Sequence, residues 1–288
     1  MEHYDILIIG AGAAGIGAAK AAWEAGCRSI CLADRKKAMG GVLLQCAHRG
    51  FGKDLDGPEY TRNLLEDFPE GITFLSNVTV LALSENKTAT LAGTEIGEKT
   101  VSFDQLILAT GCREIPMGAL PIVGTRPKGV YTAGQMQEML NLYGILPEGP
   151  VVILGSGDLG LVMAKHLAER NIPVSLVEQR NACGGMAKNQ RCLTEFPIGL
   201  YCGTTIGEVF GYPHLEGVSL ADGRYLPCKT LLIAAGLRPE RELIYGMEDH
   251  PWLHICGNCN KVHPMVEAVV NEGKQAGRTA WNNIRGAL

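Results

Sequence analysis

Two glycine-rich stretches of this 288-residue chain have the spacing of turns that bind nucleotide phosphates. The first is GAGAAG at residues 10–15, and Asp34 follows its last glycine by nineteen residues. The second is GSGDLG at residues 155–160, and Glu178 follows by eighteen. The glycines of such a turn let a pyrophosphate approach the backbone, the next helix attracts its charge, and the acid accepts from a ribose hydroxyl. The pattern predicts two dinucleotide sites in one protein, with electrons passing between them.

Each turn lies between an apolar run and a helical pattern. Ile6–Ile9 and Val151–Leu154 are continuous apolar runs, as expected for parallel strands covered on both faces. Helices are expected from Ala13 to about Ala25 and from Asp158 to about Arg170. The alternative is a glycine-rich turn that binds nothing, and the acid at the end of the following strand argues against it.

Composition bounds the class of protein. The formal net charge is −4 and no basic block is present, so nucleic acid and anionic membrane surfaces are not expected partners. No apolar run approaches the roughly 20 residues that span a bilayer, and Met1–Asp5 lacks the basic start of a signal peptide. We expect a soluble, cytoplasmic α/β protein with two Rossmann-like dinucleotide-binding domains, in which parallel sheets carry covering helices and small antiparallel segments. The ten cysteines are scattered, so most are expected to be reduced and buried.

Two later segments carry a resemblance to a known family. Leu106–Gly111 is an apolar strand that ends in Ala-Thr-Gly, and Ile255–Asn258 precedes a helical stretch from about Met265 to Arg285. With the two turns, they make the whole chain resemble the two-dinucleotide-binding flavoproteins of the pyridine nucleotide-disulfide oxidoreductase superfamily. The resemblance implies that the first turn holds FAD and the second NAD(P)H. It also implies an FAD-binding domain, an NAD(P)-binding domain and a return segment of the first, at residues 1–118, 119–248 and 249–288.

The resemblance assigns FAD contacts around the first turn and the segments that return to it. Relatives have Gly-Asp where this chain has Gly257-Asn258, and an asparagine hydrogen-bonds a hydroxyl without supplying charge. The expected FAD residues are Gly10, Gly12, Ala13, Ala14, Gly15, Asp34, Arg35, Gly41, Gln45, Val80, Ala109, Thr110, Gly111, Asn258 and Met265.

The second turn is assigned to the nicotinamide dinucleotide. Glu178 favours NADH over NADPH, because a carboxylate repels a 2′-phosphate and accepts from a free 2′-hydroxyl. Arg180 lies two residues later and softens this preference. Leu231–Pro239 resembles the strand that closes the second domain of the superfamily. The expected NAD residues are Gly155, Gly157, Asp158, Leu159, Gly160, Glu178 and Gly236.

The redox disulfide of the superfamily is missing from the sequence. Disulfide reductases place it as Gly-Gly-x-Cys-x-x-x-x-Cys, and here Leu43 and His48 stand at the two cysteine positions. Cys46 lies between them without a partner at the required spacing. Thioredoxin reductases keep a Cys-x-x-Cys in the second domain, whereas Cys183 and Cys192 are separated by eight residues. We therefore expect no catalytic disulfide.

One Cys-x-x-Cys does occur, at Cys256 and Cys259. A chance spacing of packed side chains, a redox pair near the flavin and half of a metal site are the alternatives. No second matched pair accompanies it, so no metal site is predicted.

A narrower resemblance involves GGVLLQCAHRGFG at residues 40–52 and ATGCRE at residues 109–114, which leads to GALPIVGTRP at residues 118–127. These strings resemble flavoproteins found beside anaerobic glycerol-3-phosphate dehydrogenase-like proteins. They also resemble the alpha subunits of dye-linked proline dehydrogenase, opine oxidase and hydrogen cyanide synthase. That subgroup implies a partner, either a dehydrogenase or an electron-acceptor subunit. Only twenty residues separate Gly236 from Gly257, fewer than relatives commonly have. The shorter segment leaves open how well the chain itself covers the flavin, and a partner subunit is a candidate to cover it instead.

No catalytic residue is assigned, because hydride transfer between a nicotinamide and a flavin requires no acid–base pair from the protein. Three residues are weak candidates. His48 is either near the flavin or in a surface loop, His263 is either a proton donor or a residue of the helix cap, and Cys46 is a packed side chain more readily than a nucleophile.

Three hypotheses remain for function. The first is an FAD-dependent NAD(P)H oxidoreductase that moves a hydride between its two cofactors. The second is an electron-transfer flavoprotein subunit of a multi-subunit amino-acid, opine or glycerol-3-phosphate dehydrogenase complex. The third is an FAD-binding module with a vestigial NAD site, against which the intact glycines and Glu178 argue. The electron acceptor, the direction of electron flow and the oligomeric state are left open.

Overall fold

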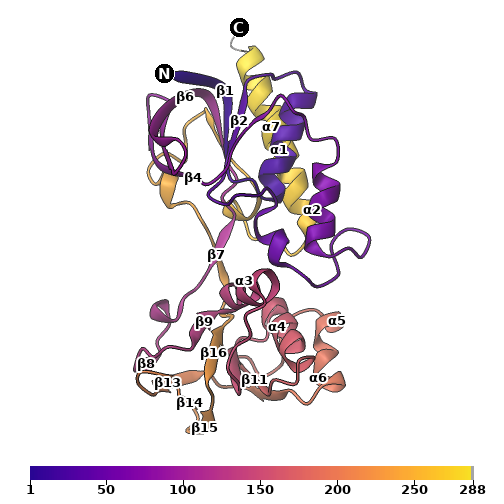
Figure 1. The fold of residues 1–288 in the computed structure, drawn as a ribbon, viewed down its shortest axis with the longest axis vertical. Helices are drawn as coiled ribbons and strands as arrows, with labels where there is room; N and C mark the ends of the chain where they lie inside the picture. The colour runs from indigo at the N-terminus through magenta and orange to yellow at the C-terminus, as the bar shows by residue number, and fades with distance from the viewer. Residues whose placement is uncertain (287–288) are drawn as a thin grey trace. The chain divides into compact units, whose positions relative to one another are not determined.

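The computed structural model describes residues 1–286, and its chain forms two compact units. Unit 1 comprises Met1–Arg113 together with the described part of Arg238–Leu288, and unit 2 comprises Glu114–Leu237. Strands β7 (Cys112–Glu114) and β17 (Leu237–Pro239), in which the chain passes between the units, pair with each other. Each unit is an α/β assembly around a parallel sheet, so the expected fold class is confirmed (Figure 1).

Unit 1 is built on a seven-stranded sheet with the order β3-β2-β1-β6-β5-β4, in which β18 also pairs with β6. Strands β3, β2, β1, β6 and β18 are parallel, whereas β4 and β5 form an antiparallel hairpin on β6. The strands are β1 (Glu2–Ile9), β2 (Ile30–Ala33), β3 (Thr73–Leu75), β4 (Val78–Ser84), β5 (Thr88–Gly93), β6 (Gly97–Leu108) and β18 (Leu253–Ile255).

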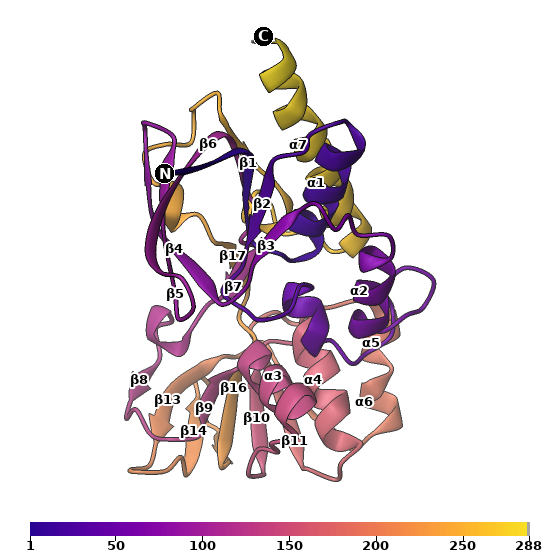
Figure 2. The same cartoon turned by 45° about the horizontal axis from the view of Figure 1, so that its top comes forward.

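Helices α1 and α7 lie side by side against one face of this sheet (Figures 1 and 2). A Cβ on Gly273 or Gly277 of α7 would overlap a carbonyl oxygen of α1, so these glycines permit the close approach of the two helices. Neither α7 nor any other helix within residues 1–286 is long and apolar enough to cross a membrane. The helices of unit 1 are α1 (Ala13–Glu24), α2 (Gly57–Leu65) and α7 (Val266–Gly286), with 3-10 helices η1 (Gly41–Gln45), η3 (Glu242–Ile244) and η4 (Gly257–Cys259).

The central strands of unit 1 alternate their side chains between two cores. Ile6 and Ile8 of β1 are fully buried beneath α1 and α7. Leu7 and Ile9 point to the opposite face, where they pack with Phe103 of β6 and other residues. A continuous apolar run is therefore what a strand covered on both faces requires.

Unit 2 is built on a five-stranded parallel sheet with the order β12-β11-β10-β16-β9 (Figure 2). A second, four-stranded sheet has the order β15-β14-β13-β8 and supplies the small antiparallel segment. The strands are β8 (Val123–Gly124), β9 (Val130–Thr132), β10 (Val151–Leu154), β11 (Val174–Glu178), β12 (Gly199–Cys202), β13 (Ile206–Phe210), β14 (Gly217–Leu220), β15 (Tyr225–Pro227) and β16 (Thr230–Ile233).

The parallel sheet of unit 2 is also covered on both faces. Val151 and Ile153 pack with residues of α3 and α4, and Val152 and Leu154 pack with residues of the four-stranded sheet. Helix α4 ends earlier than expected, because Asn171 soon after it adopts a positive φ of 59°. The helices are α3 (Ala133–Tyr143), α4 (Asp158–Ala168), α5 (Ala187–Gln190) and α6 (Cys192–Glu195), with the 3-10 helix η2 (Met117–Ala119).

The chain passes from unit 1 to unit 2 and back again near the expected boundaries, but each passage lies several residues earlier in the sequence. The sequence placed the changes after residues 118 and 248, whereas the compact units change after Arg113 and Leu237. The second difference has a packing reason: Ile244 is fully buried in the same core as Leu7 and Trp252 of unit 1. An apolar residue in a short irregular connection does not show from sequence alone which core it joins.

Candidate dinucleotide sites

The glycine-rich turn of unit 1 has two glycines that the protein needs and one that faces open space. Gly10 has a φ of 103°, and a Cβ there would overlap the carbonyl oxygen of Ala109. A Cβ on Gly15 would overlap the carbonyl oxygen of Gly10. A Cβ on Gly12 would meet nothing within 4 Å. The packing of the protein therefore explains Gly10 and Gly15, and the room at Gly12 fits a ligand that approaches the backbone.

The turn of unit 2 repeats this arrangement. A Cβ on Gly155, whose φ is 105°, would overlap the carbonyl oxygen of Ala234, and one on Gly160 would overlap that of Gly155. A Cβ on Gly157 would meet nothing within 4 Å. The same three glycines thus have the same three physical roles in both units.

The helices that follow the two turns begin without a side-chain cap. Gly12 and Gly157 are the N-cap residues of α1 and α4, and in the described chain no side chain accepts from the first N–H groups of either helix. In contrast, α2 and α3 begin with complete capping boxes, formed by Asp56 with Glu59 and by Thr132 with Gln135. Uncapped N–H groups together with the positive end of the helix dipole are what a bound pyrophosphate uses.

Asp34 follows β2 and is positioned by the backbone of the first turn. Its Oδ2 accepts from the N–H of Ala11 at 2.6 Å and its Oδ1 from the N–H of Lys36 at 2.7 Å. Each carboxylate oxygen has two lone pairs, so both oxygens of Asp34 can accept a further hydrogen bond. The side chain is therefore available to a ribose hydroxyl.

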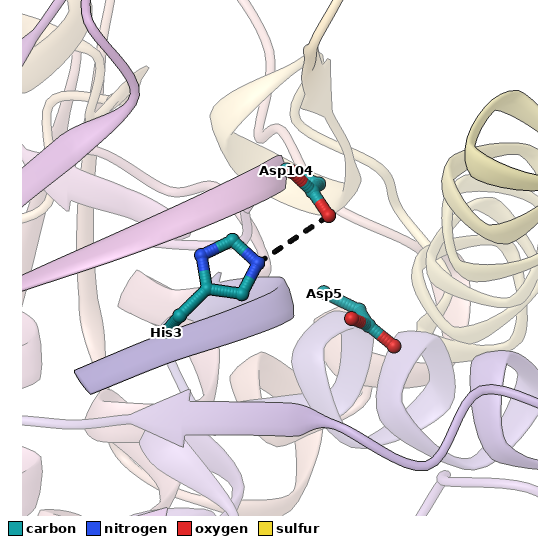
Figure 3. Close-up of side chains that lie close together, drawn as sticks. All are labelled: His3, Asp5 and Asp104. Atoms are coloured by element: carbon teal, nitrogen blue, oxygen red, sulfur yellow. Dashed lines mark ion pairs between the residues drawn. The ribbon is translucent and has the colours of Figure 1, made fainter. Parts of the chain in front are cut away.

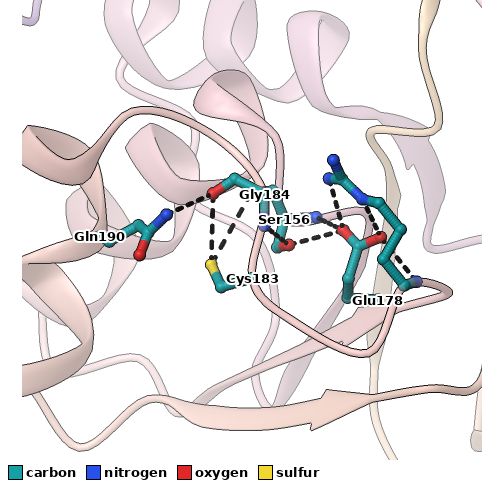
Figure 4. Close-up of polar contacts among 6 residues, drawn as sticks. Ser156, Glu178, Cys183, Gly184 and Gln190 are labelled. Atoms are coloured by element: carbon teal, nitrogen blue, oxygen red, sulfur yellow. Dashed lines mark hydrogen bonds and ion pairs between the residues drawn. The ribbon is translucent and has the colours of Figure 1, made fainter.

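Glu178 occupies the matching position in unit 2, but its carboxylate accepts more hydrogen bonds than that of Asp34 (Figure 4). Its Oε2 accepts from the backbone N–H of Ser156 at 3.0 Å, the hydroxyl of Ser156 at 2.6 Å and Nη2 of Arg180 at 3.3 Å. Its Oε1 accepts from the backbone N–H and Nε of Arg180, at 3.0 and 2.9 Å. Burial opposes ionisation of Glu178, but the bonds from Arg180 and Ser156 outweigh it and lower the pKa to about 2. Glu178 is therefore a buried carboxylate whose lone pairs are all engaged by its own unit.

Several expected FAD residues converge on the first turn. A Cβ on Gly41 would lie 3.0 Å from Cα of Gly12, and a Cβ on Gly257 would lie 2.7 Å from Cβ of Ala14. Ala109 donates its N–H to the last residue of β1 at 2.8 Å. Gly111 has a φ of 80° and, like Gly12, space where a Cβ would be. Segments far apart in the sequence thus meet at the carboxyl ends of the parallel strands, where open α/β sheets bind ligands.

Six other expected FAD residues have less direct positions. Thr110 donates its hydroxyl to the carbonyl of Glu240 at 2.6 Å, and Asn258 accepts from the N–H of His263 at 3.0 Å. The remaining positions are these: Arg35 is exposed, Gln45 ends η1, Val80 packs on the second core of the sheet, and Met265 is exposed just before α7.

The loop after Glu178 covers the start of α4, and its residues were not among those expected from the sequence. Gly184 donates its N–H to the hydroxyl of Ser156 at 2.8 Å. Asp158 accepts from the N–H of Met186 at 2.7 Å and from the side chain of Asn189 at 2.6 Å. A signal was present, because Gly184-Gly185 follows Glu178 by the same six residues that separate Gly40-Gly41 from Asp34. Leu159 packs on the core beneath α4, and Gly236, with a φ of 122°, accepts from the N–H of Ile115 at 3.1 Å.

The cysteines named in the sequence have the environment of packed side chains. Cys46 is buried and donates to the carbonyl of Val42 at 3.3 Å, and burial raises its pKa to about 12. Cys256 and Cys259 are fully buried, and burial raises the pKa of both thiols. Cys259 donates at 3.1 Å to the carbonyl of Leu108. Protonated, buried thiols of this kind are poor nucleophiles and poor metal ligands, which favours chance spacing for the Cys-x-x-Cys.

The two histidine candidates differ in their surroundings. His263 lies in the loop before α7, where its Nε2 is 2.8 Å from a carboxylate oxygen of Glu272. Glu272 also accepts from the N–H of Gly257 at 2.8 Å and from the side chain of Asn260, so it organises this loop. His48 is partly buried, with its ring 5.1 Å from that of Phe51. A chemical role for either histidine stays a prediction.

Comparisons with known proteins show which chains this one is similar to. A family model described as pyridine nucleotide-disulphide oxidoreductase matches residues 4–251. An opine oxidase subunit of Agrobacterium tumefaciens is 30% identical over 84% of this chain and 54% of its own. Hydrogen cyanide synthase subunit HcnB of Pseudomonas protegens is 30% identical over 75% of this chain and 46% of its own. The chain thus spans about half the length of these relatives.

Solved structures share the fold. Thioredoxin reductase of T. acidophilum has a TM-score of 0.79 and covers 99% of this chain and 100% of its own, at 17% identity. L-proline dehydrogenase of P. horikoshii has a TM-score of 0.74 over 98% of this chain and 56% of its own, also at 17% identity. At such identities the likeness concerns the fold alone.

Proposed function

The chain belongs to the pyridine nucleotide-disulphide oxidoreductase family and is an oxidoreductase with FAD and NAD(P)H as cofactors, which confirms the expected family. From this premise we propose that it moves a hydride between NAD(P)H and FAD without a catalytic disulfide. We assign FAD to unit 1 and the nicotinamide dinucleotide to unit 2. When bound, the two cofactors supply the redox chemistry, and the protein binds and orients them.

The observation that carries the proposal is the repeated pairing of an open central glycine with an uncapped helix. Gly12 before α1 and Gly157 before α4 leave space and unpaired N–H groups at the same point of each turn. Helices α2 and α3 of the same chain begin with complete capping boxes, and the short helices α5 and α6 have no side-chain cap, so among the described helices of eight or more residues whose N-cap is assigned, only α1 and α4 begin uncapped. A pyrophosphate in each turn would accept those N–H groups and interact with the helix dipole.

In unit 1 we assign the ribose of the FAD adenosine to Asp34, whose two oxygens retain lone pairs. Gly41 and Gly111 permit close approach of the cofactor to the backbone, because a side chain at either would be strained at φ values of 58° and 80°. The loop held by Glu272 brings Asn258 to the same edge of the sheet. An uncharged amide there would bind hydroxyl groups rather than counter a positive charge.

In unit 2 we propose NADH as the preferred dinucleotide. Burial opposes ionisation of Glu178, yet Arg180 and Ser156 keep its pKa near 2, so the group is a carboxylate at neutral pH. A fixed negative charge disfavours a 2′-phosphate. Arg180 partly offsets this charge, so the preference should be moderate.

The cysteine environments support a mechanism without thiol chemistry. Cys46 lies in the segment where the disulfide reductases of the superfamily place their redox pair, and its buried thiol has a pKa near 12. A thiolate that attacks or accepts electrons requires a depressed pKa and an accessible sulfur. Electrons are therefore proposed to leave by a route other than a protein disulfide.

A second candidate function is an electron-transfer subunit. The relatives named above are called subunits, and this chain spans about half their length. In that case a dehydrogenase or electron-acceptor partner would exchange electrons with the bound FAD, and the chain alone would turn over slowly.

The test is an anaerobic titration of the purified, FAD-loaded protein with NADH, in which the visible flavin absorption is followed. Stoichiometric bleaching is expected, and NADPH should need a higher concentration. No bleaching with FAD fully bound would contradict the first function. Bleaching by an organic substrate only in the presence of a partner protein would favour the second.

A further inference from the structure

We propose that His3, Asp5 and Asp104 form a binding site for one divalent transition-metal ion on unit 1. The site lies near the N-terminal ends of the β1 and β6 segments that pair, at the end of β1 opposite the Gly10–Gly15 turn. It is therefore separate from the dinucleotide sites, and it does not rest on the proposed function.

The register of the sheet places the three side chains on one face. β1 and β6 are parallel, with His3 opposite Ser102 and Tyr4 opposite Phe103. Side chains two residues apart on a strand share a face, so His3 and Asp5 lie beside Ser102 and Asp104. Local strand geometry alone is thus sufficient to gather the cluster.

The possible ligand atoms are close enough for one ion (Figure 3). One ligand atom from each of His3, Asp5 and Asp104 lies within 4.8 Å of the others, and Nε2 of His3 is 3.4 Å from Oδ2 of Asp104. Two ligands at about 2.1 Å from a metal are separated by roughly 3 to 4 Å, so small side-chain rotations would complete the site.

Hydrogen bonds orient the imidazole for metal binding. Nδ1 of His3 lies 3.0 Å from the hydroxyl of Ser102, and that hydroxyl donates to the carbonyl of Glu2 at 3.5 Å. Because the hydroxyl has one hydrogen, which it donates to Glu2, it accepts the Nδ1–H of the imidazole. With Nε2 unprotonated, its lone pair faces the carboxylate of Asp104, and a cation bound between them would make this contact favourable. A second hydrogen bond that sets the tautomer is the usual support of a metal-binding histidine.

The two carboxylates lack a basic partner other than His3. Within residues 1–286, no lysine or arginine forms an ion pair with Asp5 or Asp104. The nearby Lys99 is paired with Glu2 instead. The thiol of Cys27, whose pKa burial raises to about 12, lies 3.8 Å from Oδ2 of Asp5 as a weak donor. With a neutral imidazole the cluster carries two negative charges that a divalent ion would neutralise.

The donor set indicates the class of ion. One imidazole and two carboxylates suit Zn²⁺ or Mn²⁺, whereas soft ions prefer thiolates. The side chains of His3 and Asp104 are 49% and 45% exposed, so water can fill the remaining coordination positions. A bound ion would link β1 to β6, and its effect should be on stability rather than on flavin reduction.

The test uses the full-length, FAD-loaded protein without a histidine tag, after removal of metals by a chelator. Mn²⁺ is the first probe because thiolates bind it poorly. Its binding is measured by the loss of the paramagnetic resonance signal of the free ion, and Zn²⁺ is then used as a competitor. The variants are Asp104→Asn and His3→Gln. Asp222→Asn is the matched control, since Asp222 is a surface carboxylate of unit 2 paired with Arg224.

One equivalent of Mn²⁺ should bind and be displaced by Zn²⁺, and Zn²⁺ should raise the melting temperature. Each site variant should weaken binding by at least about tenfold and abolish the thermal shift, whereas Asp222→Asn should change neither. No binding to the wild-type protein, or equal binding to Asp104→Asn, would overturn the proposal and leave a simple His3–Asp104 ion pair.

Discussion

The two units present the same turn to a nucleotide, yet they treat the acid beside it differently. Asp34 in unit 1 accepts two hydrogen bonds, both from backbone N–H groups. Glu178 in unit 2 accepts five, of which three come from the side chains of Ser156 and Arg180. On the proposed assignment, the glycines of the turn determine whether a pyrophosphate can approach, and the neighbours of the acid determine how the ribose is recognised.

The loop after each acid adds to this comparison. In unit 1, Gly40 donates its N–H to the carbonyl of Ala11 at 2.8 Å, and in unit 2, Gly184 donates to the hydroxyl of Ser156 at 2.8 Å. The loops therefore bind their turns at matching positions through different chemical groups. Unit 2 has Ser156 where unit 1 has Ala11, and the hydroxyl of Ser156 joins the polar network around Glu178.

The largest expected effect comes from a matched pair of variants, Gly12→Val and Gly157→Val. The φ values of −78° and −65° suit any residue, and a Cβ at either position meets open space, so both variants should fold. Gly12→Val should be purified without FAD. Gly157→Val should retain FAD and require at least about 100-fold more NADH for bleaching, which is about 2.7 kcal/mol of binding.

Absorption spectra after purification show which variant has lost FAD, and anaerobic NADH titrations show which binds NADH more weakly. Thermal melting is the control for folding. The assignment of one dinucleotide to each unit would be refuted if both variants lost the same cofactor or if neither lost any.

A smaller effect is expected from Arg180→Ala. The substitution frees Oε1 of Glu178 for a ribose hydroxyl and removes the guanidinium that would attract a 2′-phosphate. The preference for NADH over NADPH should rise by roughly tenfold, about 1.4 kcal/mol. Glu178→Arg should shift the preference towards NADPH. Equal ratios of the two affinities in the wild-type protein and both variants would show that these residues do not recognise the ribose.

The network around Glu178 should also appear in the pH dependence of stability. Bonds from Arg180 and Ser156 overcome the cost of burial and lower the pKa of Glu178 from 4.5 in the unfolded chain to about 2 in the folded one. The stabilisation is therefore complete above pH 4.5 and is lost as the pH falls towards 2. Glu178→Gln should lower the free energy of unfolding of unit 2 by roughly 2 kcal/mol at pH 7 and remove this dependence.

Hydrogen exchange of the amides of α4 and β11 measures this effect in unit 2. The three tryptophans, Trp23, Trp252 and Trp281, all lie in unit 1, so their fluorescence serves as the internal control. A pH profile that is the same in the variant and the wild-type protein would contradict the assignment.

The smallest effect is expected from Cys46→Ala. Its thiol is buried and protonated, and it bonds a carbonyl of its own segment. Flavin reduction by NADH and reoxidation should change by less than about twofold, because the proposed hydride transfer does not involve this sulfur. A loss of an order of magnitude in stopped-flow reduction would restore a thiol to the mechanism.

Much of the framework could be predicted from spacing. Glycines at fixed intervals require a tight turn, and a continuous apolar run requires a strand covered on both faces, so both turns and the strands before them were expected. The partners of Glu178 were not expected. The number of hydrogen bonds at a carboxylate depends on side-chain rotamers, which a sequence does not give.

Two other features were missed for different reasons. The Gly184-Gly185 loop became recognisable only when the two halves of the chain were compared with each other. Ile244 sits in an irregular connection without periodicity, so its membership of the unit 1 core, and hence the early return of the chain, depends on tertiary packing. Both cases show that local patterns predict elements better than they predict which elements meet.

The most direct test of the account is a stopped-flow measurement of flavin reduction by NADH deuterated at C4, compared with unlabelled NADH, under anaerobic conditions. Direct hydride transfer between the dinucleotides of the two units predicts rapid bleaching that is slowed by the transferred deuterium, and it predicts the same isotope effect in Cys46→Ala. Absence of bleaching, or bleaching that is slowed by substitution of Cys46 and not by deuterium, would contradict it.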